Sequence, residues 1–161
     1  MRKFLTTFIK DSIFIHADMW DNNKFPLDTS NIIIDVGLSE ASAINIAAGL
    51  LLDKEPKTIY IYGVAGFMIH RHEQIKFSLK EAKKVNPESN VIFLNAGAVG
   101  YDKFGESHML TDDLELMAIH KIQCYQPQTV DDILNDLLDI LLTMDGNGSI
   151  NYIRLGKDQS W

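Results

Sequence analysis

The feature that most constrains the fold is a repeated alternation of short apolar runs with segments of helical periodicity. The runs are rich in β-branched and aromatic residues, as in strands of a parallel sheet that are buried on both faces. They lie at residues 13–15, 32–34, 58–62, 91–94, 122–125 and 150–155. Strands that alternate with helices are typical of a parallel sheet covered on both sides. We therefore expect an α/β fold, a three-layer sandwich with a mostly parallel central sheet and helices on both faces, in which residues 1–161 form a single domain.

Residues 31–52 give the clearest strand–turn–helix unit. Ile32–Ile34 predicts a buried strand, Gly37 a tight turn and Ser39 the N-cap of a helix. The helix that follows is apolar and rich in alanine, yet it begins with Glu40. The helix dipole alone can account for a carboxylate in the first turn. Because ligands collect at the carboxyl ends of strands in open α/β sheets, Glu40 is also a candidate site residue.

Further helices are expected along the chain. The apolar stripe after the turn at residues 63–66 predicts one long helix that ends at Asn86-Pro87, and its inner residues are Met68, Ile75, Leu79 and Ala82. Thr129 is expected to cap the most regular amphipathic helix. Shorter helices are expected at residues 4–9 and after Thr111.

The composition narrows the class of partner. The chain has 22 acidic and 15 basic residues, which gives a net charge of −7. This balance argues against a nucleic acid or an anionic membrane surface as the main partner. Cys124 is the single cysteine, which rules out an internal disulfide and suits a reducing compartment. With no apolar run long enough for a signal peptide or a membrane span, we expect a cytoplasmic location.

Several familiar catalytic motifs are missing from the sequence. It contains no Gly-x-x-x-x-Gly-Lys-Ser/Thr loop, no Gly-x-Gly-x-x-Gly after the first strand and no Gly-x-Ser-x-Gly elbow. His70 and His72 are two residues apart, and such positions do not face each other on a helix. We therefore expect no metal site in this chain.

Five segments carry a resemblance when they are taken together and in order. They are Ala17-Asp18; Gly37-Leu38-Ser39-Glu40 with Ile46-Ala47-Ala48-Gly49-Leu50; Phe67-Met68-Ile69-His70-Arg71-His72-Glu73-Gln74-Ile75; Gly105-Glu106-Ser107-His108 with Thr111-Asp112-Asp113-Leu114; and Tyr152-Ile153-Arg154-Leu155-Gly156. The set resembles the pyrimidine-binding domain of transketolase-like thiamine diphosphate enzymes, which include transketolase and 1-deoxyxylulose 5-phosphate synthase. The resemblance spans nearly the whole chain.

The resemblance implies a role for four residues. Glu40 matches the carboxyl group that bonds the N1′ atom of the aminopyrimidine and favours its reactive tautomer, and Phe67 matches the ring that stacks on it. His70 stands where the family has an arginine in its cofactor-binding motif. His108 matches a histidine that reaches substrate hydroxyls or a developing oxyanion. The implied catalytic residues are thus Glu40 and His108, and the implied cofactor-binding residues are Glu40, Phe67 and His70, with no metal ligand.

The sequence departs from the family pattern at four positions. These are Ala41, His70, Phe104 and Glu106. By resemblance, the residues near Phe104 help to select the sugar substrate. The departures therefore leave the donor and acceptor open.

One whole domain of the family has no counterpart here. In the family, a separate domain with Gly-Asp-Gly and a downstream Asn-Asn holds the diphosphate through Mg²⁺, and neither motif occurs in a matching context in this chain. The resemblance therefore implies the small subunit of a split transketolase-type transferase. It would act in a heterotetramer with a diphosphate-binding subunit, on a 2-keto donor and a sugar substrate.

Two other hypotheses fit the same sequence. The chain could be a non-catalytic, degenerate paralogue that regulates or supports a thiamine diphosphate enzyme, a reading that Ala41, His70 and Phe104 favour. It could also be a doubly wound small-molecule binder unrelated to thiamine. Binding of thiamine diphosphate in the presence of a partner chain distinguishes the last hypothesis from the others.

Overall fold

The described residues form one six-stranded, all-parallel sheet. The computed structural model describes residues 6, 9–24, 26–97, 112–142 and 148–155. The strand order is β2-β1-β3-β4-β6-β5, and every neighbouring pair is parallel. The strands are β1 (Ile13–His16), β2 (Ile32–Asp35), β3 (Thr58–Val64), β4 (Asn90–Ala96), β5 (Gln123–Tyr125) and β6 (Ile150–Leu155). The predicted α/β class with a parallel sheet is confirmed.

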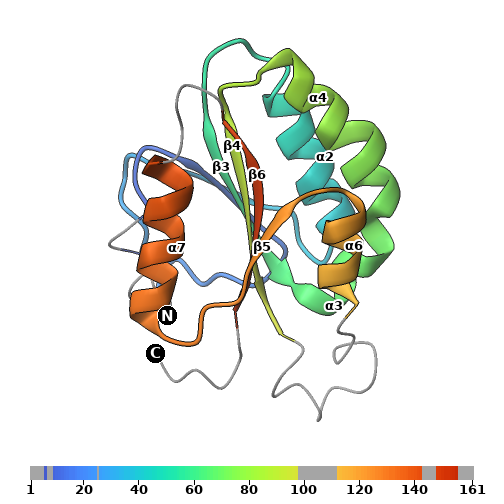
Figure 1. Ribbon diagram of the computed structural model, residues 1–161. Helices are drawn as coiled ribbons and strands as arrows, with labels where there is room; N and C mark the ends of the chain where they lie inside the picture. Colours follow the sequence, from blue (N-terminus) through green and yellow to red (C-terminus); the bar gives the residue numbers. More distant parts are fainter. Residues whose placement is uncertain (1–5, 7–8, 25, 98–111, 143–147, 156–161) are drawn as a thin grey trace.

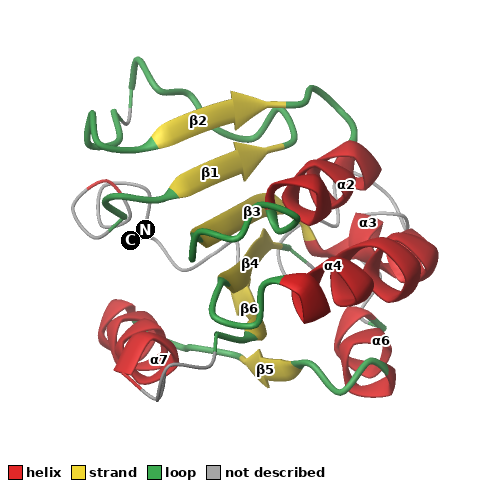
Figure 2. Cartoon of the chain, turned by 90° about the horizontal axis from the view of Figure 1, so that it is seen from above, coloured by secondary structure: helices red, strands yellow, loops and turns green. Residues whose placement is uncertain are grey.

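Helical segments lie on the two sides of this sheet. Figure 1 shows α7 on one side and α2, α4 and α6 on the other, and Figure 2 shows the same separation from above. The segments are α2 (Glu40–Leu50), α3 (Ala65–Met68), the 3₁₀ turn η1 (Ile69–Arg71), the π-helix η2 (Gln74–Leu79), α4 (Lys80–Val85), α6 (Asp113–Ile119) and α7 (Val130–Leu142). The arrangement agrees with the expected three layers.

Alternating side chains of the strands feed two separate apolar clusters. On β3, Ile59 and Ile61 join the cluster beneath α2, whereas Tyr60 and Tyr62 join the cluster beneath α7. This alternation is the two-residue period of a strand with both faces buried. The two clusters fix the sheet between its helices, and the carboxyl ends of the strands meet along one edge.

The prediction of a fully buried strand at Ile32–Ile34 was wrong in its burial. Strand β2 lies at the edge of the sheet next to β1, and Ile32 is 60% exposed. A run of isoleucine residues indicates only that the segment favours an extended strand. The position of a strand within a sheet depends on pairing with distant segments, which the run does not encode.

The single long helix predicted after β3 is divided into short segments. Strand β3 continues through Gly63, where a turn was expected, and α3 begins directly at Ala65. The chain then passes through the 3₁₀ turn and the π-helix before α4, which ends at Val85 as the Asn86-Pro87 pair predicted. The predicted inner stripe is nevertheless confirmed, because Met68, Ile75, Leu79 and Ala82 are all buried. Short π-helical segments frequently occur at functional sites.

The two predicted helix caps differ in outcome. Thr129 Oγ1 accepts a hydrogen bond from the Asp132 amide at 3.1 Å, and Asp132 Oδ2 accepts one from the Thr129 amide at 2.8 Å, which is a reciprocal cap for α7. Ser39 occupies the N-cap position of α2 but makes no side-chain cap bond. Its hydroxyl instead bonds the Ser42 hydroxyl at 2.7 Å.

Some predicted features fall outside the described residues. Thr111 and all but Thr6 and Ile9 of the helix expected at residues 4–9 are among them. Within the described part of the chain, no helix combines the length and apolar character needed to cross a bilayer.

Candidate functional site

Glu40 lies at the carboxyl edge of the sheet, at the start of α2. The preceding turn is held by Gly37, whose φ of 64° is in the left-handed region, and by Asp35 Oδ1, which accepts a hydrogen bond from the Gly37 amide at 2.9 Å. Glu40 is 6% exposed, although it carries a carboxylate. Burial of a carboxylate is costly unless partners satisfy it. Its surroundings therefore decide what it can do.

Gly63 allows three side chains from different elements to come close together. A Cβ atom at this position would lie 3.5 Å from Glu40 Cγ, 3.4 Å from Met68 Cε and 3.6 Å from Asn95 Oδ1. Because Gly63 has no side chain, Glu40 and Asn95 both lie close to the position that a Cβ atom would occupy there. Sheet strands β3 and β4 and helices α2 and α3 all contribute to it.

Arg71 provides the charge opposite Glu40. Its Nη2 atom lies 3.8 Å from Glu40 Oε2, and the arginine side chain is about one-quarter exposed. This distance is within ion-pair range but exceeds that of a hydrogen bond. Glu40 therefore has a nearby positive charge, but its carboxylate forms no side-chain hydrogen bond to another residue in the described part of the chain.

Two side chains near Glu40, those of Asn95 and Arg71, carry buried polar atoms that bond no other described residue. Asn95 is fully buried, and neither its Oδ1 nor its Nδ2 bonds another described residue. The same is true of Arg71 Nε and of Gln74 Oε1, in the segment that follows β3. Each buried polar group left without a partner costs about 1–3 kcal/mol. A ligand that bonded these atoms would recover that free energy, so the cluster has the character of a binding site.

His16 ends β1 at the same edge of the sheet. Its Nδ1 atom lies 3.6 Å from Asp35 Oδ1, and burial lowers the pKa of the imidazole, opposed by the charges of Asp35 and Asp18. A hydrogen bond from the Gly37 amide is the main cause that lowers the pKa of Asp35. The edge therefore combines a neutral imidazole with an ionised carboxylate near neutral pH.

A second buried carboxylate, Asp113, has all the partners that Glu40 lacks. It is the first residue of α6 and accepts hydrogen bonds from the Tyr152 hydroxyl and from Arg154, whose Nε is 3.1 Å from Asp113 Oδ2. Burial, followed by the Asp113 charge, raises the pKa of Tyr152 well above its ordinary value. The Asn95 amide lies near the Tyr152 hydroxyl and partly opposes this rise, without hydrogen-bonding geometry. This network joins α6 to β6 next to the candidate site.

The structure brings together only some of the residues expected from the sequence. Glu40 is buried in the site, and Phe67 is half-buried in α3, next in the chain to Met68. His70 is exposed, and Arg71, one residue later, is the one that lies beside Glu40. His108 lies outside the described residues.

Asn95 and Arg71 were not identified from the sequence. The available signal for Asn95 was its place as the first polar residue after the apolar run of β4. Arg71 gave a weaker signal, because a charged residue among charged neighbours is typical of a solvent-exposed helix face.

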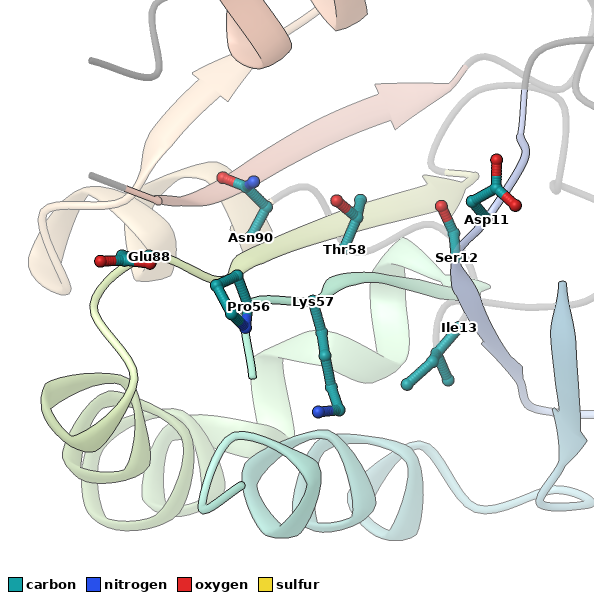
Figure 3. A pocket seen from close by; sticks show the side chains of 8 residues that line it. All are labelled: Asp11, Ser12, Ile13, Pro56, Lys57, Thr58, Glu88 and Asn90. Carbon is teal, nitrogen blue, oxygen red and sulfur yellow. The ribbon is translucent and has the colours of Figure 1, made fainter. Parts of the chain in front are cut away.

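The opposite edge of the sheet holds a different pocket. A cavity of about 240 Å³ lies at the amino ends of β1, β3 and β4. Figure 3 shows the side chains that line it: Asp11, Ser12, Ile13, Pro56, Lys57, Thr58, Glu88 and Asn90. Several of its polar groups serve the fold. Asn90 Oδ1 accepts a hydrogen bond from the Ser149 amide, and Lys57 Nζ bonds Asp53. This pocket is therefore a weaker candidate than the edge that carries Glu40.

Comparisons with known proteins add no family. No protein-family model matches the chain, and no curated protein shows significant similarity to it. Among the described residues, no group of three or more histidine, cysteine, aspartate or glutamate side chains is placed to hold a metal ion. The geometry around Glu40 and the sequence resemblance are therefore the basis for assigning a function to this chain.

Proposed function

We propose that this chain is the aminopyrimidine-binding subunit of a split, transketolase-type thiamine diphosphate transferase. The observation that carries the proposal is Glu40, a buried carboxylate at the carboxyl edge of a parallel sheet, with buried polar atoms of Asn95 and Arg71 nearby that lack hydrogen bonds to the described residues. This is where open α/β sheets bind ligands. The ordered sequence resemblance to the pyrimidine-binding domain supports the same assignment.

The residues present fit an aminopyrimidine ring. Glu40 would bond the ring nitrogen N1′, and half-buried Phe67 offers an aromatic face for stacking. The unused donor and acceptor of Asn95 supply further hydrogen-bonding capacity next to Glu40. When bound, thiamine diphosphate supplies carbanion chemistry for the transfer of a ketol or acyl group. The part of this chain is to bind and orient the ring and to hold a proton at the carboxyl group of Glu40.

A second subunit is part of the proposal. It would bind the diphosphate through Mg²⁺, and the two chains would form a heterotetramer that acts on a 2-keto donor and a sugar acceptor. Leu38, two residues before Glu40, is 84% exposed at this edge of the sheet. A partner that covered this edge would bury it. A cytoplasmic location, consistent with the single cysteine, belongs to the same proposal.

The test uses the chain purified from its own cells with its co-purifying partner. The readout is the rate at which the C2 proton of bound thiamine diphosphate exchanges with solvent deuterium, because this rate needs no knowledge of the substrates. We expect Glu40→Gln to slow the exchange by about 10²–10⁴-fold, the usual range for a residue that assists proton transfer. Glu55→Gln, which changes an exposed carboxylate in a turn, is the matched control and leaves the rate unchanged. An unchanged rate in Glu40→Gln would contradict the role given to Glu40.

One observation favours the alternative of a non-catalytic partner protein. The Arg71 guanidinium lies beside the Glu40 carboxylate, where it competes with a ring for that carboxylate. In this alternative, the complex would form normally, but thiamine diphosphate would bind with the same affinity whether residue 40 is Glu or Gln. Isothermal titration of both complexes distinguishes the two functions.

A further inference from the structure

Four lysines line an open pocket far from Glu40. The pocket has a volume of about 350 Å³ and lies between α4, the turn from α6 to β5 and the start of β6. Figure 2 shows α4 and α6 next to each other on the same face of the sheet. Its basic lining residues are Lys80, Lys83, Lys84, His120 and Lys121. They gather at the amino ends of the strands, whereas Glu40 is at the carboxyl ends.

The positive charge of this lysine pocket is only partly neutralised. Lys84 forms an ion pair with Glu81 at 2.6 Å. Lys80 Nζ donates instead to the main-chain oxygen of His120 at 2.8 Å, and Lys83 Nζ donates to the main-chain oxygens of Asn86 and Pro87. No acidic side chain is among the described residues that line the pocket. A protein with a net charge of −7 thus concentrates uncompensated positive charge at one place.

Lys121 occupies a backbone position that normally belongs to glycine. Helix α6 ends in a Schellman motif, because the Ile122 amide bonds Met117 O and the Lys121 amide bonds Ala118 O, each at 2.9 Å. Lys121 is the left-handed residue of this motif, with a φ of 55°. Glycine adopts this conformation without strain, whereas a residue with a side chain does not. A lysine that lines the pocket therefore occupies a strained backbone position.

Burial lowers the pKa of two basic groups that line the pocket. Burial first, then the charges of His72, Lys80 and Lys76, lower the pKa of His120. Burial also lowers the pKa of Lys83. Partly desolvated lysines without a counter-ion bind anions favourably, since less water has to be removed and screening is weaker.

We propose that the lysine pocket is a binding site for a small molecule that carries phosphate groups. Lysine binds phosphate as a point charge, and several lysines around one cavity suit a group with more than one negative charge. The pocket is of the size of a small-molecule site. A nucleic acid fits less well, because the net negative charge of the protein opposes a long polyanion. The proposal does not depend on thiamine diphosphate or on a partner subunit.

The test measures binding of inorganic pyrophosphate and of inorganic phosphate to the full chain by isothermal titration at low salt. We expect saturable binding that is tighter for pyrophosphate and weakens as ionic strength rises. Lys121→Gly is the decisive variant, because it relieves the left-handed strain while it removes one charge. It should raise the melting temperature and weaken pyrophosphate binding by at least about tenfold. Lys83→Gln should weaken binding to a similar extent.

Control variants distinguish specific binding in the lysine pocket from nonspecific electrostatic attraction of anions to the protein. Lys24→Gln removes the same charge from an exposed turn outside the pocket and should leave the affinity unchanged. Equal weakening by Lys24→Gln and Lys121→Gly would overturn the proposal. So would citrate binding as tightly as pyrophosphate, or an absence of saturable binding up to about 10 mM pyrophosphate. A shift of the His120 ring signals in the NMR spectrum on titration locates the binding at this pocket.

Discussion

Glu40 and Asp113 are two buried carboxylates in matching positions with opposite surroundings. Each is the first residue of a helix, and each has an arginine within ion-pair distance. Asp113 accepts hydrogen bonds from Tyr152 and Arg154. Within the described part of the chain, the one polar partner of Glu40 is Arg71, and at 3.8 Å it is too distant for a hydrogen bond.

Under the proposed function, Asp113 is a structural carboxylate and Glu40 is a carboxylate that a ligand can bond. A buried charge with a complete set of partners holds elements together, and removing one partner leaves an uncompensated charge. A buried charge with incomplete partners costs stability in the free chain, and a ligand can bond it. Real proteins accept such costs at functional sites. The same chemical group thus joins α6 to β6 at one place and remains available to a ligand at the other.

The largest expected effect comes from changing both carboxylates to amides and comparing the free energies of unfolding. Asp113→Asn removes a fully buried negative charge that pairs with the partly buried Arg154, so we expect a loss of about 3 kcal/mol. Glu40→Gln removes an ion pair at 3.8 Å together with the cost of burying a poorly partnered carboxylate. Because the two effects offset each other, the free energy of unfolding should change by less than about 1 kcal/mol. Urea denaturation of the two variants measures both values.

One result would contradict the distinction drawn between Glu40 and Asp113. If Glu40→Gln destabilised the chain as much as Asp113→Asn, Glu40 would be a structural residue of α2 and the proposed site would lose its basis. Arg154→Gln provides a check from the other partner, because it should reproduce most of the loss seen with Asp113→Asn.

An intermediate effect, in the opposite direction, is expected at Asn95. Its buried amide makes no hydrogen bond to a described residue, so Asn95→Leu keeps the number and branching of the side-chain heavy atoms and removes two unsatisfied polar atoms. The free energy of unfolding should rise by about 1 kcal/mol. Asn90→Leu on the same strand is the matched control: Asn90 Oδ1 accepts a hydrogen bond from the Ser149 amide, so that variant should be less stable than the parent. A loss of stability in Asn95→Leu would show that its amide is satisfied in solution.

The fold was largely predictable because its signals are local. The strand runs, the inner stripe of Met68, Ile75, Leu79 and Ala82, and the cap at Thr129 all depend on residues close together in the chain. The edge position of β2 was not predictable in this way, since it depends on which strands pair. The division of the helix after β3 into 3₁₀, π and α segments was also missed, because segments of 3 and 6 residues are too short for the spacing of their apolar residues to reveal the helix type.

The candidate site was predictable only in part. Glu40 combined two local signals, a glycine turn and a carboxylate at the start of an apolar helix. Whether His70 or Arg71 would lie near Glu40 depended on a rotation of one residue in an irregular helix, which the sequence resemblance does not fix. Asn95 became a candidate only when its burial and its missing hydrogen bonds were seen together.

The smallest expected effect concerns pH and distinguishes the buried imidazole at the site edge from an exposed one. Burial lowers the pKa of His16 in the folded chain, while Asp35 and Asp18 oppose that shift. The unfolded chain therefore binds a proton more readily, so the contribution of His16 to stability is complete above about pH 6.5 and is lost as the pH falls below it. Burial also lowers the pKa of His120, which therefore affects stability with the same sign.

We expect the free energy of unfolding to decrease between pH 7 and about pH 5, and His16→Gln to remove part of that decrease. Exposed His70 is the control, and if His70→Gln flattened the pH profile as much as His16→Gln, the contrast between buried and exposed imidazoles at this edge would be wrong.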